Sequence, residues 1–182
     1  MTIKITVTGV GGSGKTTLSG KLADNLSIPL IPEIGRLLCA ELGYERIGEV
    51  PDQEGFKRMA LERQIAAEKE HASYVADRCV IDCWVLWQRW NICSAMSYDT
   101  EAIYRTVAGH APIYSHIVYL PPRFEVQEDG FRWTDPDYIQ QVDRIFRMTF
   151  FDLQLQERVL MLKTDTVDER LAEVKDWLGK AS

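Results

Sequence analysis

The chain has 182 residues, of which 46% are hydrophobic and 26% are charged, and its formal net charge is −6. This length corresponds to about one domain, and the composition is that of an ordinary globular protein, which excludes disordered, fibrous and collagen-like classes. The acidic balance argues against non-specific binding to nucleic acids or anionic membranes, because the field of the protein repels phosphate groups.

The amino-terminal residues and the cysteines give two further expectations. The first residues lack the apolar core and cleavage site of a signal peptide, and no segment contains the ~18 apolar residues that are needed to cross a bilayer. The four cysteines, at positions 39, 79, 83 and 93, show no paired CxxC spacing. We therefore expect reduced thiols in a cytoplasmic protein that does not enter a membrane.

Strands and helices are predicted to alternate along the chain, because short apolar runs are separated by segments with helical periodicity. The predicted strands lie at residues 3–8, 28–31, within 73–82, 116–120 and 159–162. The predicted helices lie at 15–23, 33–43, 53–72, after the third strand up to about 94, 99–109, 136–156 and 167–178. This alternation implies right-handed βαβ units, and so a single α/β domain over residues 1–182 with a parallel sheet.

Two of the strands carry a signal about their place in the sheet. The nearly continuous apolar run at 3–8 favours a parallel sheet that is covered on both faces. The prolines in and beside 28–31 confine that strand to an end or an edge of the sheet.

The strongest motif follows the first strand: residues 9–16, GVGGSGKT, match G-x-x-x-x-G-K-[ST] without a mismatch. Glycines let the backbone curl so that its N–H groups face phosphate oxygens, and the following helix adds its positive N-terminal dipole. In such a loop Lys15 can reach the β- and γ-phosphates, and the Thr16 hydroxyl can hold Mg²⁺. The absence of an Asn-Lys-x-Asp motif favours ATP over GTP. The nucleotide-binding residues are thus predicted to be Gly9, Gly11, Gly12, Ser13, Gly14, Lys15, Thr16 and Thr17.

An acid and an arginine follow the third predicted strand. If this strand occupies residues 74–77, Asp77 lies at its carboxyl end, where the ligands of open α/β sheets bind. Asp77 could then hold Mg²⁺ or accept a proton from an acceptor hydroxyl, and Arg78 could bridge phosphates. A competing register makes residues 79–82 the strand and Asp82 the acid on the Mg²⁺ side. We favour Asp77, because the run from residue 79 lacks Gly and Pro and suits a buried helix.

Two further segments carry candidate substrate-binding residues. Glu33 and Arg36 follow the second strand three residues apart, so both side chains can face an acceptor, or they can form an exposed helical ion pair. Residues 122–135 form a long loop with prolines, aromatic residues and two arginines, which is typical of a lid. Arg132 is the first candidate to stabilise the transferred phosphoryl group, and Arg123 is the second.

Three tryptophans, Trp84, Trp87 and Trp90, recur at intervals of three residues in the fourth predicted helix. They could stack on a nucleobase, but the same spacing is typical of a packed core stripe, and we favour the core.

These motifs together resemble the small P-loop ATPase- and kinase-like family that includes the nicotinamide riboside kinase domains of bacterial NAD-biosynthesis regulators. The chain is similar, more distantly, to thymidylate and deoxynucleoside kinases. The likeness covers nearly the whole chain and rests on residues 9–16, on Pro32-Glu33 with Arg36, on Asp77-Arg78 with Asp82, and on 119–122 leading to 129–132. The resemblance implies a five-stranded parallel sheet with a lid, Glu33 and Asp77 at the acceptor site, and Arg132 as the lid arginine.

The sequence therefore predicts Mg²⁺-dependent transfer of the ATP γ-phosphoryl group to a small nucleoside or nucleotide. Lys15 and Thr16 would hold the donor with Mg²⁺, Asp77 would orient the acceptor, and Arg78 with Arg132 would stabilise charge. Glu33, Arg36, Asp82 and Arg123 would bind the acceptor.

Two alternative functions stay open. One is a nucleotide-dependent ATPase or switch with a protein partner. The other is a kinase that acts on modified bases in DNA, and the net charge disfavours it unless a local basic groove exists. The oligomeric state is not indicated by the sequence.

Overall fold

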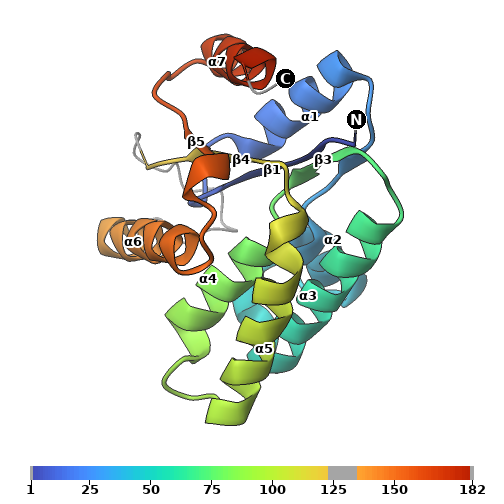
Figure 1. Cartoon of the computed structure of the whole chain (residues 1–182). Helices are drawn as coiled ribbons and strands as arrows, with labels where there is room; N and C mark the ends of the chain where they lie inside the picture. Colours follow the sequence, from blue (N-terminus) through green and yellow to red (C-terminus); the bar gives the residue numbers. More distant parts are fainter. Residues whose placement is uncertain (1, 123–134, 181–182) are drawn as a thin grey trace.

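Five parallel strands form one central sheet in the order β2-β3-β1-β4-β5 (Figure 1). The computed structural model describes residues 2–122 and 135–180. The strands are β1 (Lys4–Gly9), β2 (Leu30–Ile31), β3 (Tyr74–Asp77), β4 (His116–Leu120) and β5 (Val159–Met161). The short strands β2 and β5 are the edges, so the proline-flanked segment 28–31 lies where its sequence predicts. The α/β class, the five strands and their parallel order are confirmed.

Helices cover both faces of this sheet (Figure 1). The helices are α1 (Lys15–Leu26), α2 (Ile34–Glu41), α3 (Gln53–Lys69), α4 (Val80–Asn91), α5 (Ser97–His110), α6 (Pro136–Asp152) and α7 (Val167–Lys180). Three short 3₁₀ turns are η1 (Ile47–Glu49), η2 (Ala111–Ile113) and η3 (Gln156–Arg158). Helices α1 and α7 pack on one face, and α3, α4, α5 and α6 contribute to the core on the other. No helix in the described ranges is long and apolar enough to cross a membrane.

The core is divided in two by the sheet because successive side chains of a strand point to opposite faces. In β4, Ile117 and Tyr119 pack with α4 and α6, whereas Val118 and Leu120 pack with α1 and α7. All four side chains are buried, which explains why this strand is a continuous apolar run in the sequence.

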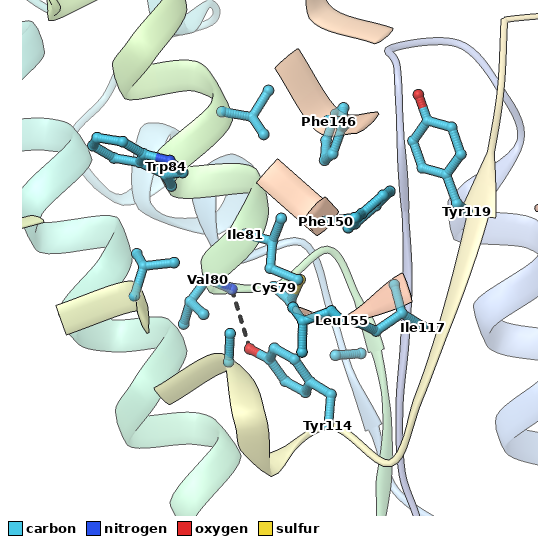
Figure 2. Packing of buried hydrophobic residues seen from close by; sticks show 14 of the residues in the cluster. Cys79, Val80, Ile81, Trp84, Tyr114, Ile117, Tyr119, Phe146, Phe150 and Leu155 are labelled. Atoms are coloured by element: carbon cyan, nitrogen blue, oxygen red, sulfur yellow. Dashed lines mark hydrogen bonds between the residues drawn. The ribbon is translucent and has the colours of Figure 1, made fainter. Parts of the chain in front are cut away.

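Helix α4 is fixed to the sheet by a buried tyrosine. The Tyr114 hydroxyl accepts a hydrogen bond from the Val80 backbone nitrogen at 3.2 Å, which satisfies one of the free donors at the start of the helix (Figure 2). Trp84 and Trp87 are buried in the core, as we expect for a packed stripe, but Trp90 is 39% exposed and lies outside it. The start of α4 therefore has a defined position beside β3, and so do Asp77 and Asp82.

Candidate functional site

The loop between β1 and α1 curls over the start of α1, and its glycines allow this shape. Gly9 has a φ of 139°, and a Cβ atom there would overlap the backbone oxygen of Leu120 in β4. Gly14 caps α1 with a φ of 88°. Residues other than glycine rarely adopt these positive φ angles. The loop therefore follows a path that leaves the free N–H groups of the first turn of α1 available to an anion.

Lys15 is buried beneath this loop. Its Nζ atom donates to the Val10 carbonyl oxygen at 2.6 Å and to the Ser13 hydroxyl at 3.3 Å, and it forms no ion pair with the described residues. Burial and, after it, the positive charge of Arg78 lower the pKa of Lys15 to about 7, although the nearby acids oppose this shift. The ammonium group is thus held by neutral oxygens only, which a phosphate could replace.

Asp77 ends β3 directly beside β1, where Val7 is its register partner. Its side chain is 1% exposed, and among the described residues neither carboxylate oxygen has a hydrogen-bond partner. Burial raises the pKa of Asp77, and the nearby Thr16 side chain and Arg78 oppose that rise. A buried carboxylate without a donor is costly, and oxygen ligands of this type are those that Mg²⁺ prefers. Thr16 and Asp77 therefore fit the protein ligands of a Mg²⁺ ion.

Arg78 joins two acids from different parts of the chain. Its Nε atom donates to Glu33 Oε1 at 2.6 Å, and its Nη1 atom donates to Asp82 Oδ1 at 2.8 Å. The backbone of Arg78 has a φ of 74°, an unusual left-handed conformation for a residue with a side chain. Such strain persists only where the surroundings impose it, and it concentrates at functional sites.

Glu33 lies at the start of α2, just after β2. Burial alone would raise the pKa of Glu33, but the charges of Arg78 and Lys15 outweigh it and lower that pKa to about 2. Arg36 is more loosely placed: its Nε atom lies 3.6 Å from Glu33 Oε2, and its side chain is about half exposed. The principal partner of Glu33 is thus Arg78, which the spacing of Glu33 and Arg36 in the sequence does not reveal.

Asp82 occupies the first turn of α4 and is fully committed to hydrogen bonds. It accepts from Thr8 Oγ1 at 2.7 Å and from the Cys79 backbone nitrogen at 3.0 Å, in addition to Arg78. The bond from Cys79 caps the helix. The strand register that would have ended at Asp82 does not occur, because residues 80–91 form α4.

A cavity of about 380 Å³ opens beside the phosphate loop. The loop, the Glu33–Arg78–Asp82 cluster, the start of α2, η1 and one face each of α3, α4 and α6 line it. The lining residues are Gly9, Val10, Gly11, Glu33, Ile34, Gly35, Ile47, Gly48, Gln53, Phe56, Lys57, Ala60, Gln64, Arg78, Cys79, Asp82, Cys83, Leu86, Trp90, Asn91, Tyr138, Val142 and Phe146. Asp77 is not among them. A small organic molecule bound here would therefore contact Glu33 and Arg78 but not Asp77.

Aromatic side chains form one wall of this cavity. Trp90 and Tyr138 lie with their ring centroids 5.6 Å apart, and the Arg89 guanidinium carbon is 4.7 Å from the Trp90 ring centroid and 5.4 Å from that of Tyr138. Trp90 is the one of the three tryptophans that lines the cavity, so stacking on a base stays possible at that position alone.

Arg170 is a residue of the site that the sequence motifs missed. It belongs to α7 and is 5% exposed, and its Nη1 atom donates to the Ser13 carbonyl oxygen at 2.7 Å. Its Nε atom donates to the Thr164 carbonyl oxygen at 3.2 Å. The available signal is its position: Arg170 shares a helical stripe with the buried Val174 and Leu178, where a charged residue needs partners.

The structure thus brings together five of the predicted site residues: Lys15, Glu33, Asp77, Arg78 and Asp82. Arg36 lies at their edge. Arg123 and Arg132 lie outside the described residues, together with most of the loop 122–135.

Comparisons with known proteins place this geometry in context. A family model described as an AAA domain matches residues 4–170. Among solved structures, NadR in complex with NR has a TM-score of 0.73 and 19% identity, over 90% of this chain and 46% of that chain, so this chain spans about half the length of NadR. Deoxyadenosine kinase from M. mycoides has a TM-score of 0.71 and 12% identity, over 99% and 100% of the two chains. Thymidylate kinase from Candida albicans has a TM-score of 0.69 and 12% identity, over 98% and 92%. No curated protein sequence matches the chain.

These likenesses show the fold, which is that of nucleoside and nucleotide kinases with a phosphate loop. They confirm the resemblance that the sequence indicates.

Proposed function

We propose that this chain, which belongs to the AAA domain family, is a kinase that transfers the γ-phosphoryl group of ATP to a small nucleoside or nucleotide with the help of Mg²⁺. One observation carries the proposal. Gly9, Val10 and Gly11 of the phosphate loop line the same cavity as Glu33 and Arg78. A donor on the loop and an acceptor in the cavity would therefore meet, which is the positioning that phosphoryl transfer requires.

The donor side consists of the loop, Lys15, Thr16 and Thr17. The backbone N–H groups and the start of α1 would bind the phosphates, and Lys15 would exchange its carbonyl partner for a phosphate oxygen. Thr16 and Asp77 would hold Mg²⁺, which supplies neutralisation of the charge that develops on the phosphate oxygens. Arg170 would keep the loop in this shape through its hydrogen bond to Ser13.

The acceptor side centres on Glu33 and Arg78. Because the transition state of phosphoryl transfer is loose, the acceptor hydroxyl needs orientation more than early deprotonation. A carboxylate with a pKa of about 2 suits this role, since it stays ionised and accepts a hydrogen bond from the hydroxyl. Arg78 would contact the transferred phosphoryl group, Asp82 would hold Arg78, and Arg36 would bind the acceptor from the rim. The sequence suggested two roles for Asp77, as a ligand of Mg²⁺ or as the group that orients the acceptor hydroxyl. We propose the first role for Asp77.

Two further expectations from the sequence belong to this proposal. Arg132 and Arg123 would close over the phosphates from the loop 122–135, and the kinase would act in the cytoplasm.

Acceptor-dependent turnover tests the function. Purified protein is incubated with γ-labelled ATP, Mg²⁺ and a panel of nucleosides and nucleotides, and the products are separated. We expect label on one class of acceptor, and loss of this activity in Lys15→Met with an unchanged circular-dichroism spectrum. Label that reaches water alone would instead support the nucleotide switch. Binding to DNA in a low-salt gel shift would support the kinase of modified bases.

A further inference from the structure

Lys57 is a buried cation in the wall of the acceptor cavity. It lies in the third helix, α3, and is 8% exposed. Its Nζ atom approaches the Gln53 backbone oxygen at 3.5 Å and the Gln53 Oε1 atom at 3.4 Å, and it forms no ion pair with the residues that the structure describes. Both distances exceed those of ordinary N–H···O hydrogen bonds. Buried lysines are rare unless an anion pairs with them.

The lysine does not hold the surrounding structure together. The Gln53 side chain is fixed by its own amide nitrogen, which donates to the Ile47 and Val50 carbonyl oxygens of the η1 segment at 2.6 and 2.8 Å. Burial lowers the pKa of Lys57 to about 8, with some compensation from Glu54, so the ammonium group is charged in most molecules at pH 7. The protein alone thus bears the cost of a desolvated charge without a matching interaction.

The two acids that line the cavity already have a cationic partner. Glu33 and Asp82 both pair with Arg78, so neither is available to Lys57. The aromatic wall offers no free ring face to a cationic ligand, because the Arg89 guanidinium already lies over the Trp90 ring. Among the described residues that line the cavity, Lys57 is therefore the one charged group without an ion-pair partner, and the partner that it lacks is an anion.

Lys57 is also far from the reacting end of the cavity. Gln64 of the same helix lies beside the Glu33–Arg78–Asp82 cluster, and its Nε2 atom donates to the Arg78 carbonyl oxygen at 3.4 Å. Lys57 precedes Gln64 by two helical turns, which is about 10 Å along α3. Phe56 and Ala60 line the cavity near the lysine and offer an apolar surface to a ring. An acceptor whose hydroxyl meets Glu33 would present its distal end to Lys57.

We infer that the acceptor carries an anionic group at the end remote from the hydroxyl that receives the phosphoryl group, and that Lys57 binds this group; carboxylates serve as the probes of it below. The inference rests on the proposed kinase function. It separates this chain from an enzyme for acceptors with a positively charged base, such as nicotinamide riboside, because a cationic ring would be placed in the field of an unpaired ammonium group.

Two pairs of probes that differ in one carboxylate test the inference: nicotinate riboside against nicotinamide riboside, and 5-carboxyuridine against uridine. Binding is measured calorimetrically without ATP, and kcat/KM is measured with ATP and Mg²⁺. We expect the carboxylated member to bind about 10- to 100-fold more tightly, the worth of one charge-assisted hydrogen bond. Lys57→Met should abolish this preference, and Lys57→Arg should retain most of it.

The matched control is Arg63→Met, which removes a positive charge from the exposed side of the same helix, where Arg63 pairs with Glu41. It should leave the preference unchanged. A preference for the neutral or cationic member, or one that Lys57→Met retains, overturns the inference. If no probe is phosphorylated but the carboxylate preference is present in binding, the inference survives and the proposed function does not.

Thermal unfolding without ligand gives a second readout. Lys57→Met should melt higher than the wild type, by roughly 2–4 °C, because it removes an unpaired buried charge from a chain of this length. A lysine with a structural role would lower the melting temperature of Lys57→Met. That result, together with a carboxylate preference that Lys57→Met retains, would overturn the inference.

Discussion

Asp77 and Asp82 are five residues apart and almost equally buried, yet the structure gives opposite expectations for their replacement by asparagine. The Asp77 oxygens have no hydrogen-bond partner within the described chain, whereas Asp82 accepts from Thr8, Cys79 and Arg78. We therefore expect Asp82→Asn to destabilise the protein. The protein with Asp77→Asn should be at least as stable as the wild type.

The loss of stability that we expect for Asp82→Asn follows from the ion pair between Asp82 and Arg78. Removal of one partner of a buried ion pair costs about 3–5 kcal/mol. The asparagine carbonyl can still accept one hydrogen bond, so the low end of that range, about 3 kcal/mol, applies. For a domain of this length the melting temperature should then fall by roughly 6–12 °C.

The expectation for Asp77 follows from its raised pKa, which is caused mainly by burial. Between the pKa of the unfolded chain, near the ordinary aspartate value of 3.8, and the higher pKa of the folded chain, the folded chain binds more protons than the unfolded chain. The free energy of unfolding therefore falls as the pH rises through this window. Asparagine does not titrate, so the stability advantage of Asp77→Asn over the wild type should grow as the pH increases above about 4.

Thermal melts of the three proteins between about pH 4 and pH 8 measure these differences, and calorimetric titration with ATP measures function. Asp77→Asn should lose the strengthening of ATP binding by Mg²⁺, although its fold is intact. A melting temperature for Asp77→Asn as low as that of Asp82→Asn would refute the reasoning. So would an Asp82→Asn protein that melts with the wild type.

Three further predictions concern the phosphate loop, the first with a control in α1. Gly9→Ala forces a Cβ atom against β4 at a φ of 139°, so it should lower the free energy of unfolding by about 3 kcal/mol in a denaturant titration. Gly20 has open space around it, and Gly20→Ala should raise the free energy of unfolding by about 1 kcal/mol. Lys15, with a pKa of about 7, should take up nearly one proton when ATP binds at pH 8 and almost none at pH 6, as calorimetry in buffers of different ionisation enthalpy would show. Equal uptake at both pH values would exclude Lys15 as the group. Arg170→Met should weaken ATP binding about tenfold through the lost bond to Ser13, and an unchanged dissociation constant would show that the loop needs no such support.

The strands were predictable because their apolar runs are short and are bounded by turn residues. The run from Cys79 contains no Gly or Pro and is too long for a strand, which predicts a helix, and α4 confirms this prediction. The end of α6 was predicted at 156 but lies at Asp152. There the chain turns at Gln154 with a φ of 55°, and the sequence offers neither Gly nor Pro to mark that turn.

For the site, the sequence predicts which side chains share one edge of the sheet but not how they pair. Glu33 and Asp77 follow neighbouring parallel strands, so their common location could be expected. The sequence suggested a pair between Glu33 and Arg36, but the bond from Arg78 is shorter, at 2.6 Å against 3.6 Å. That pairing depends on the left-handed backbone of Arg78, which no local pattern encodes. Lys57 went unnoticed because its burial arises from tertiary packing.

Lys15 and Asp77 have opposite charges and lie near each other, yet they form no ion pair within the described chain. Burial lowers the pKa of Lys15 and raises that of Asp77, which favours the neutral form of each, so both charges are costly in the protein alone. Their mutual attraction would be the simplest relief, but Lys15 is held by the Val10 oxygen and Asp77 by the end of β3. An anion would relieve the lysine and a cation would relieve the aspartate. The arrangement therefore favours a ligand that brings both charges at once, as a magnesium–triphosphate complex does, over either ion alone.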